Sequence, residues 1–302
     1  MPCESTRERG RGGDSHPGGH VASADSGAIR GALIDSHVHV VSADEEAYPR
    51  ASDSPAGAHA AAAIGAEEML EIVDDAGIDQ VVLVQSFAAY AFDNRYVLDM
   101  ASSYPDRFVA VCGIDPKASD VEGVAEGLVR AGACGLRVLA FTEDFEAECL
   151  RPLMQVAADS GVAVCLLAVP RILEGLGDVL RDYPDVPLVL DHCGLKGLDA
   201  GAEDLGAPEF FGLAQFEAVY PKLSTRVFAH ATGPVERIVD VLVDRFGASR
   251  LMWGSDFPAS PVESYGAAVR EARELIARLD AAGLEEILNG TANRVFRLGS
   301  AN

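Results

Sequence analysis

The 302-residue sequence predicts an α/β fold, namely a single-domain (β/α)8 TIM barrel, and three observations favour this class. The length suits such barrels, which typically have about 250 residues. Short apolar runs recur along the chain, and a longer helical pattern follows each of them. Eight such repeats favour a closed barrel over an open doubly wound sheet, which is the alternative fold at this point.

The N-terminal segment differs in composition from the rest of the chain. Residues 1–30 are rich in Gly, Ser, Arg and Asp and contain almost no large apolar side chains. Such a segment buries too little apolar surface to offset the entropy that is lost on ordering. We therefore expect a disordered tail over residues 1–30 and a barrel domain over residues 31–302.

The apolar runs are predicted to form the strands of the barrel. They are rich in β-branched residues and mostly lack polar alternation, as is typical of parallel strands that are covered on both faces. In chain order they are Ala32–Val40, Gln80–Gln85, Phe108–Ile114, Cys134–Leu139, Val162–Val169, Pro187–His192, Tyr220–Val227 and Leu251–Asp256.

The stretches between these runs have apolar residues at helical spacing. The stretch from Pro234 to Gly247 has recognisable ends: Pro234 suits the first helical position, and Gly247 suits the position that follows the helix. The clearest predicted helices are Glu67–Ala76, Ser119–Gly132, Arg171–Tyr183 and Pro234–Phe246.

Charge limits the expected partners. The chain has 24 Lys and Arg residues against 47 Asp and Glu residues, which gives a net charge of −23. So acidic a surface repels phosphate backbones and anionic lipid, so neither nucleic acid nor a membrane surface is expected. We expect a small-molecule substrate, and an anionic one requires basic side chains at the site itself. A homo-oligomer is left open.

The cysteines and the apolar segments bear on the compartment. The six cysteines include no C-x-x-C pair, and three of them lie in apolar strand-like runs. They are interpreted as small buried residues in a reducing compartment. No apolar run reaches the roughly 18 residues that span a bilayer, and the N-terminus lacks the apolar stretch of a secretory signal. The expected location is cytoplasmic.

Two histidines on the first predicted strand are candidates for catalysis or metal binding. They occur in the sequence Asp35-Ser36-His37-Val38-His39. Because side chains alternate along a strand, His37 and His39 point to the same side. At the C-terminal mouth of a barrel, two such imidazoles can clamp a metal ion. The alternative is one buried histidine and one surface histidine.

Two further candidates end later strands. His192 ends the sixth strand, and Asp256 ends the eighth, just before Pro258. A carboxylate at a strand end can bind a metal, take a proton from water, or do both. The alternatives are a core histidine and a loop carboxylate. Asp191 is expected to point away from the pore.

The combination resembles a known superfamily. D-x-H-x-H on the first strand, a histidine at the end of the sixth and W-G-S-D-F-P on the eighth are similar to the amidohydrolase superfamily. Within it the chain resembles the amidohydrolase-2 group from about residue 31 onward. This resemblance implies a barrel hydrolase whose catalytic residues are His37, His39, His192 and Asp256.

Two departures bear on the cofactor. The fifth strand lacks the metal-binding histidine of many zinc-dependent members and related decarboxylases, and the fourth lacks the lysine that others carboxylate. The pattern is more similar to the lactonase branch, in which one enzyme works without a metal and others use one divalent ion. The resemblance implies either a zinc or manganese ion held by His37, His39 and Asp256, or a metal-free site in which the histidines bind the oxyanion.

The same branch indicates how a substrate is held. Arg137 on the fourth strand matches an arginine that grips a substrate carboxylate; the alternative is an ion pair that stabilises the barrel. Arg226, expected to end the seventh strand, and Ser86 are further substrate-binding candidates. The expected function is hydrolysis of a carboxylated lactone by water that Asp256 activates. A metal-dependent nonoxidative decarboxylase and an inactive barrel with a binding role are the rival hypotheses.

Overall fold

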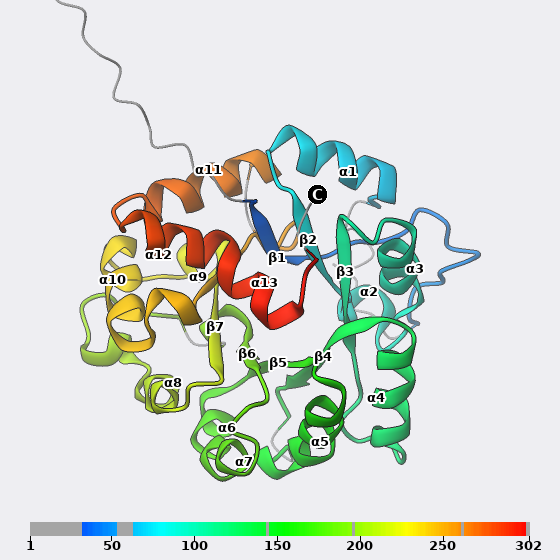
Figure 1. Cartoon of the computed structure of the whole chain (residues 1–302), viewed down its shortest axis with the longest axis horizontal. Coiled ribbons are helices and arrows are strands. Elements are labelled where there is room, and N and C mark those ends of the chain that lie inside the picture. Colours follow the sequence, from blue (N-terminus) through cyan, green and yellow to red (C-terminus); the bar gives the residue numbers. More distant parts are fainter. Residues whose placement is uncertain (1–31, 53–62, 143–144, 195–196, 261–262, 300–302) are drawn as a thin grey trace, which may run out of the picture. The chain divides into compact units, whose positions relative to one another are not determined.

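The computed structural model describes residues 32–52, 63–142, 145–194, 197–260 and 263–299, so the tail expected over residues 1–30 lies outside the described residues. Among these residues, parallel strands form one sheet in the order β1-β2-β3-β4-β5-β6-β7-β8. β8 also lies against β1, and helices surround the ring of strands (Figure 1). The predicted single-domain (β/α)8 barrel is confirmed.

The strands lie close to the predicted runs. They are β1 Ile34–Val38, β2 Gln80–Val84, β3 Phe108–Gly113, β4 Ala133–Ala140, β5 Ala163–Ala168, β6 Leu188–Leu190, β7 Val219–Ser224 and β8 Met252–Gly254. All except β4 end before the predicted run does. β7 ends at Ser224, so Arg226 lies in a helix and does not end a strand. Val227 and Phe228 are buried in that helix, which is why the apolar pattern runs past the end of β7.

The helices follow the strands around the barrel. Their bounds are α1 Ala66–Asp75, α2 Phe87–Tyr90, α3 Arg95–Ser103, α4 Val121–Arg130, α5 Arg151–Ser160, α6 Pro170–Glu174, α7 Leu176–Asp182, α8 Pro208–Phe211, α9 Thr225–Ala229, α10 Val235–Phe246, α11 Tyr265–Ile276, α12 Ala281–Glu285 and α13 Thr291–Phe296. The helix predicted over Arg171–Tyr183 is two helices that meet at Gly175. In the described part of the chain, no helix is long and apolar enough to cross a membrane.

The seam between β8 and β1 positions part of the candidate site. At Gly254 a Cβ atom would lie only 2.7 Å from Cβ of His37, so only glycine permits this approach. The Asp35 carboxylate accepts hydrogen bonds from the backbone N–H groups of Ser255 and His37, at 2.9 Å and 3.0 Å. The N–H of Asp256 donates to the carbonyl of His37 at 2.8 Å. These contacts close the barrel and bring Asp256 beside β1.

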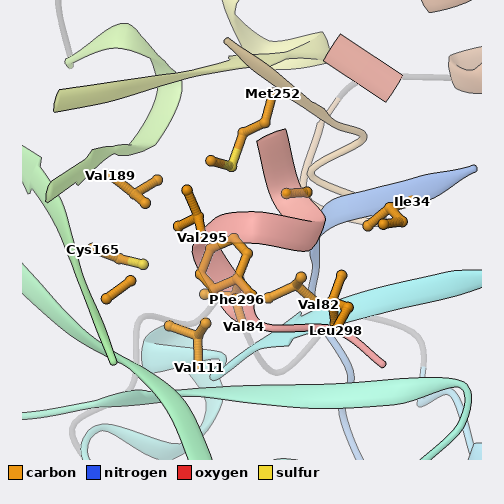
Figure 2. Close-up of a cluster of buried hydrophobic side chains, with 12 residues drawn as sticks. Ile34, Val82, Val84, Val111, Cys165, Val189, Met252, Val295, Phe296 and Leu298 are labelled. Carbon is orange, nitrogen blue, oxygen red and sulfur yellow. The ribbon is translucent and has the colours of Figure 1, made fainter. Parts of the chain in front are cut away.

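The N-terminal end of the barrel is filled by α13. Phe296 lies at the centre of a buried apolar cluster, with Val84, Val111 and Val295 around it (Figure 2). The side chain of Gln80, the first residue of β2, donates to the carbonyl of Gly299 at 3.2 Å, which places Gly299 beside the start of that strand. Apolar packing therefore occupies the N-terminal end of the barrel, and the polar residues of the candidate site lie towards the C-terminal ends of the strands.

Candidate active site

Three imidazoles and one carboxylate face one another at the C-terminal end of the strands. Nε2 of His37 lies 3.2 Å from Nε2 of His39, and Oδ1 of Asp256 lies 3.6 Å and 3.4 Å from these two atoms. Nε2 of His192 lies 3.9 Å from the same oxygen. The structure thus brings together the four residues that the sequence motifs indicate.

The ring of His39 is fixed by the neighbouring strand. Its Nδ1 lies 2.7 Å from the carbonyl oxygen of Val84, at the end of β2. Because a carbonyl only accepts hydrogen bonds, Nδ1 of His39 carries a hydrogen and donates it to Val84. The contact therefore fixes the orientation of the ring and directs Nε2 towards His37 and Asp256.

Asp256 follows β8 with φ of 56°, in the left-handed region that non-glycine residues seldom occupy outside functional sites. Its Oδ2 accepts hydrogen bonds from Oγ of Ser260 at 2.8 Å and from Nε of Arg226 at 3.3 Å. Burial alone would raise the pKa of Asp256, but its contacts with the neighbouring imidazoles, His39 foremost, hold that pKa below the usual range. Asp256 is therefore ionised, with Oδ1 facing the histidines.

His192 lies just beyond β6. It was expected to end that strand, but it lies in the one-turn 3₁₀ segment Asp191–Cys193, with φ of 55°. Its Nδ1 contacts Oγ of Ser224, the last residue of β7, at 2.7 Å. Burial lowers the pKa of His192 to about 4, so the ring is neutral at neutral pH. β7 thus orients a neutral imidazole towards Asp256.

A buried charged cluster lies behind His37. Oδ2 of Asp191 accepts a hydrogen bond from Nε of Arg137 at 2.8 Å, and Oδ1 lies 3.1 Å from Nζ of Lys222 and 3.5 Å from Nδ1 of His37. Burial alone would raise the pKa of Asp191, but Lys222, His37 and Arg137 hold it well below its ordinary value. The expectation that Asp191 points away from the pore is wrong, because strand alternation stops at Leu190 and the 3₁₀ turn redirects the side chain.

The substrate-binding candidates lie in different environments. Arg226, in α9, has a side chain 40% exposed and lies beside Asp256. Arg137, in β4, is 6% exposed and paired with Asp191; its terminal nitrogens have no hydrogen-bond partner among the described residues. Ser86 is half-buried and directly precedes α2. Each remains a candidate contact for a substrate.

Three donor atoms have the arrangement that a small divalent ion requires. Ligand atoms about 2.0–2.1 Å from a tetrahedral zinc ion lie about 3.3 Å from one another. The distances among Nε2 of His37, Nε2 of His39 and Oδ1 of Asp256 are 3.2, 3.4 and 3.6 Å. These residues therefore fit one face of a metal tetrahedron and could hold such an ion.

The sequence motifs did not single out Lys222 or Ser224, although both fall within the predicted seventh strand. The two residues are two positions apart and therefore share one face of that strand. Lysine is almost never fully buried unless it is paired. The predicted seventh strand is expected to be covered on both faces. A lysine within it therefore indicated that the barrel interior contains a partner of opposite charge.

The barrel fold, the pair of histidines on β1 and the carboxylate after β8 together are typical of the barrel hydrolases. The comparison with known families agrees with this class. Residues 34–298 match the model of the amidohydrolase family, so the chain belongs to that family. It is 30% identical over 205 residues to L-fucono-1,5-lactonase from Burkholderia ambifaria, which covers 65% of this chain and 70% of that protein. The resemblance to the lactonase branch of the amidohydrolase-2 group is confirmed.

Solved structures show the same fold. A protein from Pseudomonas putida assigned as a 2-pyrone-4,6-dicarboxylic acid hydrolase has a TM-score of 0.68 and 26% identity, covering 88% of this chain and 98% of its own. An amidohydrolase from Burkholderia multivorans with bound zinc has a TM-score of 0.69 and 23% identity, covering 89% of this chain and 100% of its own.

Proposed function

We propose that this amidohydrolase-family enzyme opens a lactone that carries a carboxylate. One observation carries the proposal: Oδ1 of the ionised Asp256 faces three imidazoles, while the partly exposed Arg226 lies beside the same carboxylate. The first arrangement suits hydrolysis of a carbonyl compound, and the second suits recognition of an anionic group. The lactonase named among the relatives supports the choice of a cyclic ester.

The chemistry follows from the side chains. Water attacks the lactone carbonyl carbon while Asp256 takes its proton; the ring C–O bond then breaks, and the leaving oxygen receives that proton. With the Ser224 hydroxyl donating to Nδ1 of His192, the hydrogen of this ring lies on Nε2 and can donate to the developing oxyanion. The product is the ring-opened acid.

One divalent ion, zinc or manganese, is part of the proposal. His37, His39 and Asp256 would hold it, and it would act as a Lewis acid towards the lactone carbonyl. His192 lies outside this ligand set and serves the same oxyanion. A metal-free site, in which all three imidazoles act on the oxyanion, is the competing mechanism.

The test is Asp256→Asn in a screen of carboxylated lactones. Loss of the general base should lower kcat by about 10² or more, because positioned acid–base groups typically contribute 10²–10⁴. Asp244→Asn, an exposed change on α10, is the matched control and should retain full activity. Circular dichroism should show that both variants are folded at the assay temperature. A folded Asp256→Asn protein with normal kcat would refute the role of Asp256.

The rival functions correspond to distinct outcomes of the same screen. Release of carbon dioxide from aromatic carboxylates without lactone opening would favour a decarboxylase, although β5 carries no histidine among Ala163–Ala168. Absence of turnover on the whole panel, with or without added metal, would favour an inactive barrel with a binding role.

A further inference from the structure

Exposed phenylalanines lie at the same end of the barrel as the candidate active site, and the chemistry proposed above does not use them. In the described part of the chain, the large apolar side chains that remain exposed are those of Phe87, Phe92, Val124 and Phe141. Val124 lies on α4, outside the ring of strands (Figure 1), whereas each phenylalanine follows the C-terminal end of a strand. Phe87 begins α2, and Phe92 follows that helix.

Phe87 and Phe92 form one aromatic pair. Their ring centres lie 5.2 Å apart and their planes meet at 62°, which is an edge-to-face contact. The two residues are 38% and 39% exposed. The segment from Ser86 to Phe92 contains no charged residue, although the whole chain has a net charge of −23. Single exposed apolar residues are common, but a contiguous apolar patch on a protein surface is typical of a binding site.

Buried amide side chains fix the backbone that carries this pair. Nε2 of Gln85 donates to the carbonyls of Ala91 and Asp93, at 2.8 Å and 3.2 Å. Nδ2 of Asn94 donates to the carbonyl of Phe92 at 2.9 Å. Both amides are buried, so three successive carbonyls are held from inside the protein. Phe92 therefore presents its ring from a defined backbone position.

The backbone directly before Phe92 is strained. Ala91 has φ of 49°, in the left-handed region that residues other than glycine seldom occupy. Such conformations cost energy and are concentrated at active sites and ligand-binding segments. The segment therefore combines strained backbone with exposed aromatic rings. An apolar group bound against the rings would remove them from water and offset part of this cost.

The aromatic pair and Arg226 flank the candidate active site on different sides. β1 carries the histidine pair and Asp256 follows β8, while β2 pairs with β1 and β7 pairs with β8. The aromatic pair follows β2, and Arg226 follows β7. Phe87 is three residues beyond Val84, whose carbonyl accepts a hydrogen bond from His39 at 2.7 Å. Three residues span at most about 10 Å, so Phe87 begins within that reach of the histidine's partner.

We propose that Phe87 and Phe92 form a specificity subsite for an aryl group of the substrate. This inference rests on the proposed function and narrows it: the lactone carries a carboxylate that reaches Arg226 and an aryl group that packs on the phenylalanine pair. An aromatic ring suits the pair because the edge of one ring attracts the face of another. A polyhydroxylated lactone does not, since its hydroxyl groups would lose hydrogen bonds to water against these rings.

The first test measures binding without turnover, by isothermal titration calorimetry of the full-length protein. The probes are two tetrahydrofuran carboxylates, with a phenyl or a methyl group at the same position, which contain no ester to hydrolyse. The parent protein should bind the phenyl probe about tenfold or more tightly, because a phenyl ring buries more apolar surface and adds aromatic contacts.

The double variant Phe87→Ala, Phe92→Ala should lose this preference and bind the two probes about equally. Val124→Ala, at an exposed apolar residue of α4, is the matched control and should keep the preference. Circular dichroism checks that the variants are folded. Equal affinity of the parent protein for both probes, or no binding of the phenyl probe, overturns the proposal. So does a preference that persists in the folded double variant.

The second test compares kcat/KM for the phenyl and methyl derivatives of one carboxylated lactone. In the double variant, kcat/KM for the phenyl lactone should fall about tenfold or more through a higher KM, and the methyl lactone should be little affected. Sedimentation of the parent protein and the double variant examines the other possible occupant. Dimers that form in the parent protein and are lost in the double variant would show an interface between copies and contradict the subsite.

The two proposals fail separately in these experiments. A parent protein that prefers the phenyl probe but opens no lactone contradicts the proposed function and retains the aryl subsite. A parent protein that opens the phenyl and methyl lactones with equal kcat/KM contradicts the subsite alone.

Discussion

At the scale of single residues, the two oxygens of Asp256 have separate tasks. Oδ2 is held by Ser260 and Arg226, which leaves Oδ1 directed at the imidazoles. A substrate carboxylate that binds Arg226 competes with Asp256 for the same guanidinium. We expect this competition to make Asp256 a stronger base once an anionic substrate is bound, which links recognition to catalysis.

Arg226→Met is the variant that tests this link. A charge-assisted pair with an arginine contributes roughly 1.5–3 kcal/mol, so KM for carboxylated lactones should rise about tenfold or more. KM for neutral lactones should change little. Steady-state kinetics on a carboxylated lactone and its methyl ester give the comparison. Equal losses on both substrates would show that Arg226 only supports Asp256.

Arg137→Met is the companion to that variant. Its effect on KM for carboxylated and neutral lactones is measured in the same way. Arg137 also contacts the buried carboxylate of Asp191, so Arg137→Met should lower the melting temperature as well, because that carboxylate loses one of its partners. An effect on stability alone would restrict Arg137 to the ion pair.

Sequence patterns predicted the four central residues but not the groups behind them. His37, His39 and Asp256 were recognisable because strand alternation and strand ends place them at the barrel mouth. The direction of Asp191 was not, because it depends on a turn with left-handed backbone at His192. The burial of Lys222 depends on its contacts with His37 of β1 and with Asp191 after β6, which no single run of sequence contains.

At the scale of elements, α13 is the part of the fold that closes the lower barrel. Residues of α13 and of six strands share the cluster in Figure 2. The ring of Phe296, a member of this cluster, also contacts the charged site, because its centre lies 5.5 Å from Nζ of Lys222. One short helix therefore supports both the apolar core and the floor of the charged site.

Phe296→Ala should lower the free energy of unfolding by about 3–5 kcal/mol, as is typical when a buried phenylalanine leaves a cavity. Phe92→Ala, at a ring 39% exposed, is the matched control and should cost far less. Urea unfolding monitored by circular dichroism gives both values. A loss below about 1 kcal/mol for Phe296→Ala would show that α13 does not contribute to the core.

The positions of the strands were predictable from the length and the β-branched content of the apolar runs. The residues at which strands and helices end were not. The predicted seventh strand ran into α9 because that helix also buries apolar residues. α9 has five residues, and helices this short have no stable periodicity of their own. The break at Gly175 escaped prediction because α6 and α7 together keep a helical spacing.

At the scale of the whole molecule, closure makes the strands depend on one another. β8 meets β1 through Asp35, Gly254 and the backbone of Asp256. A backbone bridge between Val38 and Phe257 also joins the two end strands of the sheet at their C-terminal ends. Strands that share a closed ring are expected to open together as one cooperative unit. Three buried cysteines offer a way to observe this, because each lies on or directly after a different strand.

Three thiols are buried on separate parts of the ring: Cys112 on β3, Cys165 on β5 and Cys193 after β6. Burial raises the pKa of Cys112 and of Cys165 to about 12, and it raises the pKa of Cys193 as well. At pH 8 these thiols are therefore protonated in the folded protein, and only the thiolate reacts with a disulfide reagent. Reaction must wait for opening.

We predict that all three react at one common rate in a variant whose other cysteines are replaced (Cys3→Ser, Cys134→Ala, Cys149→Ser). Cys149 is exposed and would otherwise react first. The reaction with a chromogenic disulfide is followed at pH 8 with increasing urea, and mass spectrometry assigns each site. Because the ring opens as a unit, the three rates should rise in parallel with the fraction unfolded. One thiol that reacts well ahead of the other two would show instead that the barrel opens locally at that strand.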